Sequence, residues 1–211
     1  DLKKEGFERK LYPFQERNLL KLVNTNAFAD FSVPGTGKTT VALAYFFFKK
    51  KKNDKLLVIS PKTTFIAWED ELKECLPRQS INVLVLSGNY KAINNKLTNF
   101  DKIALMSYNK LASQTIAGLT ITQICNRIKQ DSSINIDTFI FLDESHKIKS
   151  GTGITSTTVA ELRIAQMKPS CKLIMTGTPM PNNIKDLSPQ FLFSDPSSQN
   201  EDIGTIYIYY I

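Results

Sequence analysis

The chain has 211 residues, of which 42% are hydrophobic, so it is long enough to bury one substantial core. Its longest apolar run, VALAYFFF (Val41–Phe48), is much shorter than the roughly 18 residues of a membrane-spanning helix, and its first residues lack a signal peptide's apolar segment, so we expect no membrane partner. The formal net charge of +7 favours polyanionic partners, and three cysteines without C-x-x-C spacing favour a reducing, intracellular compartment over a disulfide framework or a zinc site.

Short β-branched or apolar runs alternate with longer amphipathic stretches, which predicts an α/β fold with a mostly parallel central sheet between helices. The predicted strands are Ala27–Ser32, Leu56–Ser60, Asn82–Leu86, Lys102–Met106, Thr138–Asp143 and Lys172–Thr176. The predicted helices are Phe14–Asn24, Lys38–Lys51, Thr64–Leu76, Lys91–Thr98, Thr120–Lys129 and Thr155–Met167. We expect one domain over residues 1–193, with an insertion at Ala112–Asp137.

Two further segments are interpreted from their composition alone. Residues 194–211 begin as a polar linker and end in a β-prone run. The basic run Lys49–Lys52 has two interpretations: a solvated helix end, where cations meet the negative end of the dipole, or a contact with nucleic acid.

The segment FADFSVPGTGKTTVALAYF places a glycine-rich turn between a predicted strand and a predicted helix, the context of a phosphate-binding P-loop. Glycines let successive N–H groups face a phosphate, a lysine reaches the β and γ phosphates, and a threonine hydroxyl ligates Mg²⁺. The predicted cofactor-binding residues are Pro34, Gly35, Thr36, Gly37, Lys38, Thr39 and Thr40. Ser32 stands where this pattern usually has its first glycine, and a plain glycine-rich turn is the alternative interpretation.

The segment FIFLDESHKIKS ends an apolar strand in two acids and contains the only histidine of the chain. Asp143 is predicted to hold Mg²⁺ together with Thr39, and Glu144 to orient or deprotonate the attacking water. A buried carboxylate pair is costly without a cation, and the metal would remove that cost. Alone, the pattern is also compatible with an acidic turn and a structural histidine; the upstream P-loop favours the catalytic interpretation, with Lys38, Asp143 and Glu144 as catalytic residues.

Six ordered segments resemble the first motor lobe of superfamily 2 helicase-like ATPases of the Swi/Snf type. LYPFQ is similar to the family's Q motif, VPGTGKT to motif I, LLVISPKTTFIAWEDEL to motif Ia, ALMSYNKL to the segment before motif II, LDESHKIK to motif II and MTGTPMPNN to motif III. The resemblance implies a three-layer, RecA-like P-loop NTPase domain that binds ATP and Mg²⁺. The MTGTP…NN element and the lysines after DESH favour this family over the DEAD-box RNA helicases.

The resemblance also implies roles for individual residues. Gln15 would read the adenine edge, and His146 would bond to Thr176 or Thr178, linking the γ-phosphate to the nucleic-acid face. This link needs the strand at Lys172–Thr176 to lie between those at Ala27–Ser32 and Thr138–Asp143. The predicted nucleic-acid contacts are Pro61, Lys62, Thr63, Ser107 and Tyr108.

Some of these residues have an alternative, purely structural interpretation. Gln15 is otherwise a polar helix residue, Ser107 a helix cap, and Lys62 a solvated loop charge. Trp68 has core-like spacing with its helix neighbours, and we interpret it as packing.

The sequence departs from the family at Pro181, where a glutamine is frequent, and nothing after Asn183 resembles the second RecA-like lobe that carries the family's arginines. Such arginines accelerate related phosphoryl transfers about 10³–10⁵-fold, so we expect this lobe alone to be nearly idle. The favoured hypothesis is an ATP-driven translocase on double-stranded DNA. The alternatives are a strand-separating DNA or RNA helicase, a nucleotide-gated scaffold without turnover, and a small-molecule kinase. The oligomeric state is not indicated.

Overall fold

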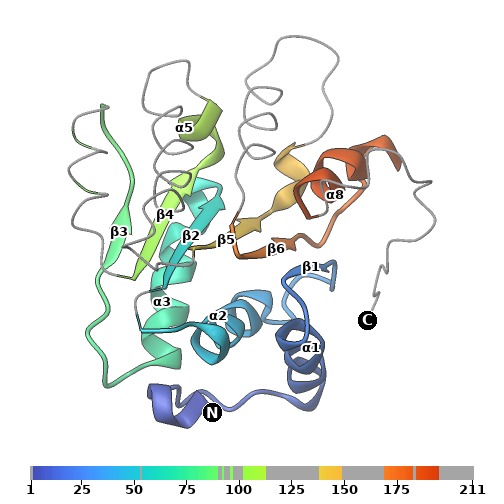
Figure 1. Cartoon of the computed structure of the whole chain (residues 1–211). Coiled ribbons are helices and arrows are strands. Elements are labelled where there is room, and N and C mark those ends of the chain that lie inside the picture. Colours follow the sequence, from blue (N-terminus) through green and yellow to red (C-terminus); the bar gives the residue numbers. More distant parts are fainter. Residues whose placement is uncertain are drawn as a thin grey trace.

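The computed structural model describes residues 2–52, 54–89, 92, 96, 102–112, 138–148, 169–182 and 184–194. Within them, six parallel strands form one sheet in the order β1-β6-β5-β2-β4-β3 (Figure 1). The strands are β1 (Ala27–Asp30), β2 (Lys55–Ser60), β3 (Val83–Val85), β4 (Ile103–Ser107), β5 (Thr138–Asp143) and β6 (Cys171–Met175). Because all run the same way, the loops that follow them gather at one edge of the sheet.

Central strand β5 shows why the sheet is covered on both sides. Successive side chains of a strand point to opposite faces. Phe139 and Phe141 therefore pack into one hydrophobic cluster, and Ile140 and Leu142 into another. These four side chains are at most 2% exposed, which matches the continuous apolar run that a doubly covered parallel strand requires.

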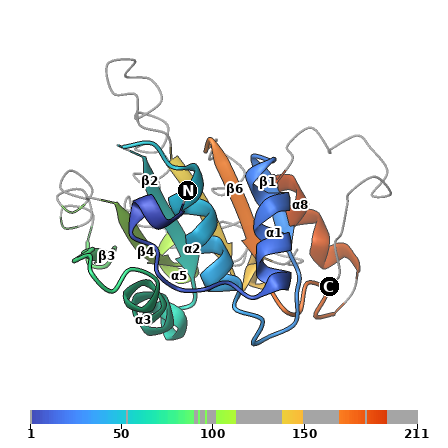
Figure 2. The same cartoon turned by 90° about the horizontal axis from the view of Figure 1, so that it is seen from below.

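The helices form the two outer layers. Helices α1 (Pro13–Val23), α2 (Lys38–Lys49) and α3 (Phe65–Cys75) lie on one face of the sheet (Figure 2), and their apolar side chains share the cluster of Phe139 and Phe141. The short helix α8 (Ser188–Ser194) and the 3₁₀ turns η3 (Ser145–Ile148) and η4 (Ile184–Leu187) cover the other face. The remaining elements are η1 (Leu2–Glu5), η2 (Lys62–Thr64) and α5 (Tyr108–Ala112).

Local sequence explains where two of these helices begin. At α1, Pro13 occupies the first turn, where its missing N–H costs nothing, and Gln15 Oε1 accepts the Tyr12 N–H at 2.9 Å as in a capping box. At α2, Gly37 precedes the helix in the left-handed conformation (φ 75°), and no side chain caps the first turn. Helix α2 is buried from Thr40 to Phe47, so it is the central helix of its layer.

The six strands and the three long helices confirm the predicted α/β architecture, and β6 lies between β1 and β5 as expected. The sheet is parallel throughout the described strands rather than mostly parallel. Helices α5 and α8 were not predicted. The helices predicted at Thr120–Lys129 and Thr155–Met167, most of Lys91–Thr98, nearly all of the insertion and the tail after Ser194 lie outside the described residues. No helix among the described segments has the length and apolar character to cross a membrane.

Replacing Phe141 by alanine should lower the free energy of unfolding by about 3–5 kcal/mol, because the ring is fully buried and stacks on Tyr45 with 5.9 Å between centroids. Urea denaturation followed by circular dichroism measures this change. Leu20→Ala, at a side chain that is 64% exposed on α1, is the control and should shift stability by no more than about 0.5 kcal/mol. Equal effects of the two variants would contradict the assigned core.

Candidate nucleotide and magnesium site

The P-loop connects β1 to α2 and is closed by its own polar groups. Asp30 Oδ1 accepts the Ser32 N–H at 3.0 Å, and the Ser32 and Thr36 hydroxyls lie 2.8 Å apart. The Thr36 hydroxyl also donates to the Val33 carbonyl at 2.9 Å. Ser32, which replaces the usual glycine, is thus buried and cross-links the loop instead of weakening it.

The lysine of the loop lies over the turn. Lys38 Nζ donates to the carbonyl oxygens of Ser32 at 2.8 Å and Val33 at 3.1 Å. Gly35 has a φ of 84°, and a β-carbon there would meet no heavy atom within 4 Å. The loop therefore combines a left-handed turn beside open space with a cation and the positive end of α2, which suits a phosphate chain.

Gln15 lies against this loop from α1. Its Nε2 donates to the Thr36 carbonyl at 2.9 Å, while its Oε1 accepts from Tyr12. A β-carbon on Gly37 would come within 2.4 Å of Gln15 Nε2, so a side chain there would displace the glutamine amide, and the positive φ favours glycine independently. The carboxamide that is predicted to read adenine thus also stabilises the P-loop through a hydrogen bond.

Asp143 ends β5 as a half-buried carboxylate. Its Oδ2 accepts the indole N–H of Trp68 at 2.8 Å, and its Oδ1 accepts the Glu144 backbone N–H at 3.0 Å. Burial raises the pKa of the Asp143 carboxyl, and the nearby Glu144 charge raises it further; the Trp68 hydrogen bond acts in the opposite direction. A cation beside the carboxylate would stabilise its charged form.

Glu144 is the one described residue other than glycine with a positive φ, at 51°. A non-glycine residue in this region carries a strain of about 1–2 kcal/mol. Its Oε2 lies 3.2 Å from His146 Nδ1, which also lies 2.8 Å from the Thr176 hydroxyl and 3.2 Å from that of Thr178. The Nδ1 atom of His146 therefore lies within hydrogen-bond distance of the Glu144 carboxylate and of both threonine hydroxyls after β6.

The loop after β6 packs directly on the P-loop. A β-carbon on Gly177 would meet Cγ and Cδ of Pro34 at 2.8 Å, although the φ of Gly177 is not in the left-handed region. Thr176 N–H also donates to the Asp30 carbonyl at 3.2 Å. The absence of a side chain at position 177 therefore permits the close approach of the two loops.

The predicted nucleic-acid contacts divide into two groups. Lys62 and Thr63 are exposed in η2, directly after Pro61 at the end of β2. Ser107 and Tyr108 are buried, at 5% and 8% exposure, so their contact with nucleic acid stays a prediction that their side chains do not favour, and the alternative of Ser107 as a helix cap is confirmed. Ser107 Oγ accepts the Lys110 N–H at 3.2 Å and caps α5, and the Tyr108 hydroxyl donates to the Asp143 carbonyl at 2.8 Å.

Thr40 has a different partner from the one expected of a cofactor ligand. Its hydroxyl is buried and donates to Glu71 Oε1 on α3 at 2.6 Å, so this side chain joins two helices. Glu71 also pairs with Arg9 at 3.1 Å. Only the backbone of Thr40 remains as a candidate phosphate contact.

Sequence reasoning missed two polar links to motif II. Trp68 is buried, as its spacing indicated, but it also donates to Asp143; an indole N–H almost always finds a partner when buried, which was the available signal. Gln190 on α8 is completely buried, accepts from the Ser145 hydroxyl at 2.6 Å and donates to the Pro179 and Asp186 carbonyls at 2.9 Å. Its only sequence signal is a glutamine beside the apolar FLF.

The P-loop and the end of β5 fit Mg²⁺ bound together with a nucleoside triphosphate. Among the described residues, no cluster of three or more His, Cys, Asp or Glu side chains could hold a metal alone. Mg²⁺ does not need one, because it keeps several waters and takes one or two protein oxygens plus phosphate oxygens. The predicted protein oxygens are those of Thr39, on α2, and of Asp143, at the end of β5.

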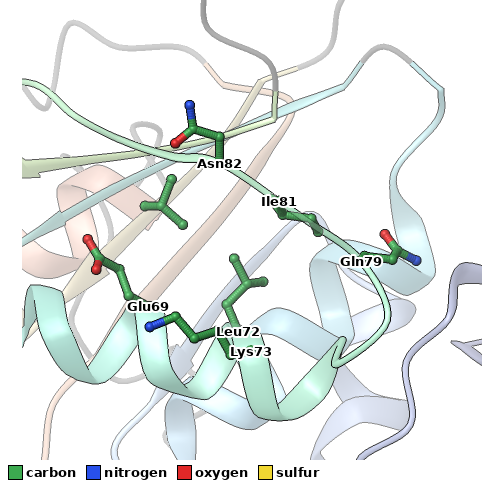
Figure 3. Close-up of a pocket in the computed structure, with 7 residues that line it drawn as sticks. Glu69, Leu72, Lys73, Gln79, Ile81 and Asn82 are labelled. Atoms are coloured by element: carbon green, nitrogen blue, oxygen red, sulfur yellow. The ribbon is translucent and has the colours of Figure 1, made fainter.

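An open pocket of about 220 Å³ lies elsewhere, between α3 and the segment that leads into β3 (Figure 3). Glu69, Leu72 and Lys73 on α3 line it opposite Gln79, Ile81 and Asn82. None of the predicted site residues lines it, and its mixed apolar and charged wall indicates no ligand class.

Gly177→Ala should lower the free energy of unfolding by about 1–3 kcal/mol, because the added methyl overlaps Pro34. Urea denaturation measures the loss. Adding Pro34→Ala removes the two overlapping carbons and should restore most of the stability. A double variant as unstable as Gly177→Ala alone would show that the two loops do not touch as described.

Comparison with known proteins places the chain in a family. The model of the SNF2-related domain matches residues 31–202. The ISWI chromatin-remodeling complex ATPase ISW1 of Saccharomyces cerevisiae is 28% identical over an alignment of 204 residues, and the match covers 90% of this chain and 16% of that protein. The chromatin-remodeling ATPase INO80 of Mycosarcoma maydis is 27% identical over an alignment of 168 residues, and the match covers 77% of this chain and 8% of that protein.

The fold has a solved counterpart. The SWI2/SNF2 ATPase core of Sulfolobus solfataricus, in complex with dsDNA, matches with a TM-score of 0.67 and 23% identity, over 90% of this chain and 37% of that one. The chain thus spans less than a fifth of each of these two curated relatives. Since the family model covers most of its length, the chain belongs to the SNF2-related domain family.

Proposed function

We propose that this chain is the ATP-binding lobe of a DNA-dependent ATPase that couples hydrolysis to translocation along double-stranded DNA. The observation that carries the proposal is the convergence of three loops at the carboxyl edge of neighbouring strands. The P-loop follows β1, Thr176 and Thr178 follow β6, and Asp143, Glu144 and His146 lie at the end of β5.

The P-loop residues would bind the triphosphate. Lys38 exchanges its backbone carbonyl partners for phosphate oxygens, and the first N–H groups of α2 point at the same anion. Thr39 and Asp143 would hold Mg²⁺, which supplies charge neutralisation on the β and γ phosphates when bound. Gln15 retains a second N–H on Nε2 and a second lone pair on Oε1, which leaves it able to read the adenine edge.

Glu144 would orient the attacking water and accept its proton. The left-handed backbone at this residue directs the carboxylate away from the strand, toward His146. The His146 ring can share a hydrogen bond with Glu144 or with the threonines after β6, but its Nδ1 carries at most one proton. A change of partner at this nitrogen would report the state of the γ-phosphate to the Thr176–Thr178 loop.

The DNA-binding side would lie beyond the ends of β2 and its neighbours. Lys62 and Thr63 are exposed there, next to Pro61, and suit contacts to a phosphate backbone without reading bases. The net charge of +7 supports the same partner by long-range attraction. A second RecA-like lobe would complete the site, and the chromatin-remodelling relatives support an intracellular, nuclear location.

A strand-separating helicase on DNA or RNA shares this first lobe. A displacement assay on DNA and RNA duplexes separates the two activities, because a translocase hydrolyses ATP on the duplex without releasing a strand.

Lys38→Ala should lower DNA-stimulated ATP hydrolysis by the full-length protein about 10²–10³-fold, because it removes a charge aimed at the γ-phosphate. Glu144→Gln should lower it about 10²–10⁴-fold while ATP still binds, because only the base is lost. Phosphate release with and without duplex DNA measures both. Lys73→Ala, a surface lysine on α3 whose side chain is 73% exposed, is the charge-matched control.

Three outcomes would reject parts of the proposal. Turnover that ignores DNA would exclude the motor. Nucleotide-dependent partner binding without phosphate release would favour a nucleotide-gated scaffold. Phosphate transfer to a small molecule would indicate a kinase.

A further inference from the structure

The peptide that joins Asp143 to Glu144 is held from both sides. Its carbonyl oxygen accepts the Tyr108 hydroxyl at 2.8 Å, and its N–H donates to Asp143 Oδ1 at 3.0 Å. These two bonds fix the peptide plane before Glu144, and the Lys147 N–H, which donates to the Glu144 carbonyl at 3.0 Å, holds the plane after it. Both planes together hold the φ of 51° at Glu144, and the Tyr108 bond is one of the contacts on which it depends. Tyr108 is the partner that belongs to another element, since it begins α5 after β4.

A residue of α3 makes a separate hydrogen bond to the Asp143 carboxylate. Trp68 Nε1 donates to Oδ2 at 2.8 Å, while the Thr64 hydroxyl, which precedes α3, donates to the Pro61 carbonyl at 2.9 Å. Thr64 ends η2 and Trp68 lies one turn into α3. The carboxylate is thus held by a residue of the helix that follows the exposed Lys62 and Thr63.

We propose that Trp68 and Tyr108 are positioning residues with separate targets: Trp68 orients the Asp143 carboxylate toward Mg²⁺, and Tyr108 holds Glu144 in its left-handed conformation. The inference rests on the proposed function, in which Asp143 holds the metal and Glu144 orients water. It adds that the segments after β2 and β4 act on the site through one hydrogen bond each, and not through packing alone.

The two targets predict different defects. Without the indole N–H, the carboxylate loses one of the donors that set its plane, so the Mg²⁺-dependent part of nucleotide binding should weaken. Without the tyrosine hydroxyl, the strained backbone at Glu144 relaxes, so the attacking water is misplaced while the metal and nucleotide still bind. Phenylalanine keeps an aromatic ring at either position and removes only the donor together with part of the volume.

The test of Trp68 measures affinity, not turnover. A non-hydrolysable fluorescent ATP analogue is titrated into the full-length protein and its Trp68→Phe variant, with Mg²⁺ and with EDTA. Loss of an outer partner of a metal ligand commonly weakens metal binding about 10–100-fold, so we expect about 10-fold weaker binding with Mg²⁺ and unchanged binding in EDTA. Added to Asp143→Asn, the same change should have no further effect on binding with Mg²⁺.

The test of Tyr108 separates kcat from binding. Tyr108→Phe should lower kcat of the full-length protein about 10-fold, or more, and leave the affinity for the analogue with Mg²⁺ unchanged. Tyr45→Phe is the matched control, because the Tyr45 hydroxyl is also buried and donates to a backbone carbonyl, that of Thr25, at 3.1 Å, but remote from motif II. It should leave kcat at the wild-type value.

The outcomes distinguish this inference from the proposed function. If the wild-type protein gains no affinity from Mg²⁺, the proposed function fails and this inference fails with it. If wild type gains affinity from Mg²⁺ and Trp68→Phe gains as much, only the role of Trp68 is overturned. If Tyr108→Phe has wild-type kcat, or loses no more than Tyr45→Phe, the role of Tyr108 is overturned; thermal unfolding identifies any variant that fails to fold.

Discussion

The site depends on the burial of one carboxylate, Asp143, at the end of a central strand. A carboxylate removed from water is costly unless it is paired or hydrogen-bonded. Here the indole of Trp68 and the Glu144 N–H donate to it, and burial still raises its pKa. The protein therefore lowers the cost of this charge without removing it, which leaves the carboxylate as a strong site for a cation.

The parallel sheet places the other groups around that carboxylate. Strand β6 lies between β1 and β5, so the loop after it touches both the P-loop, through Gly177 and Pro34, and motif II, through Thr176 and His146. On the face of the sheet covered by α8, buried Gln190 accepts from the Ser145 hydroxyl and donates to the Pro179 carbonyl, and so joins motif II to the loop after β6. A small displacement of any of these three loops therefore changes its contacts with the other two.

Much of this arrangement could be predicted from the sequence. Apolar β-branched runs between turn residues predicted the six strands. The motifs predicted that the P-loop and motif II belong to one site, because both patterns are local and strong. Helices α5 and α8 were missed because each has at most seven residues and is stabilised by tertiary contacts. Tyr108 was placed on the nucleic-acid side because a motif locates a residue in the chain but does not give the direction of its hydroxyl.

The lysine of the P-loop already rests on two backbone carbonyls, those of Ser32 and Val33. Its ammonium group is therefore partly stripped of water and confined before any anion arrives. In the proposed function, phosphate oxygens would replace these carbonyl partners without the entropy loss of ordering a mobile side chain from solvent. The lysine is thus already ordered for the anion that we propose it binds.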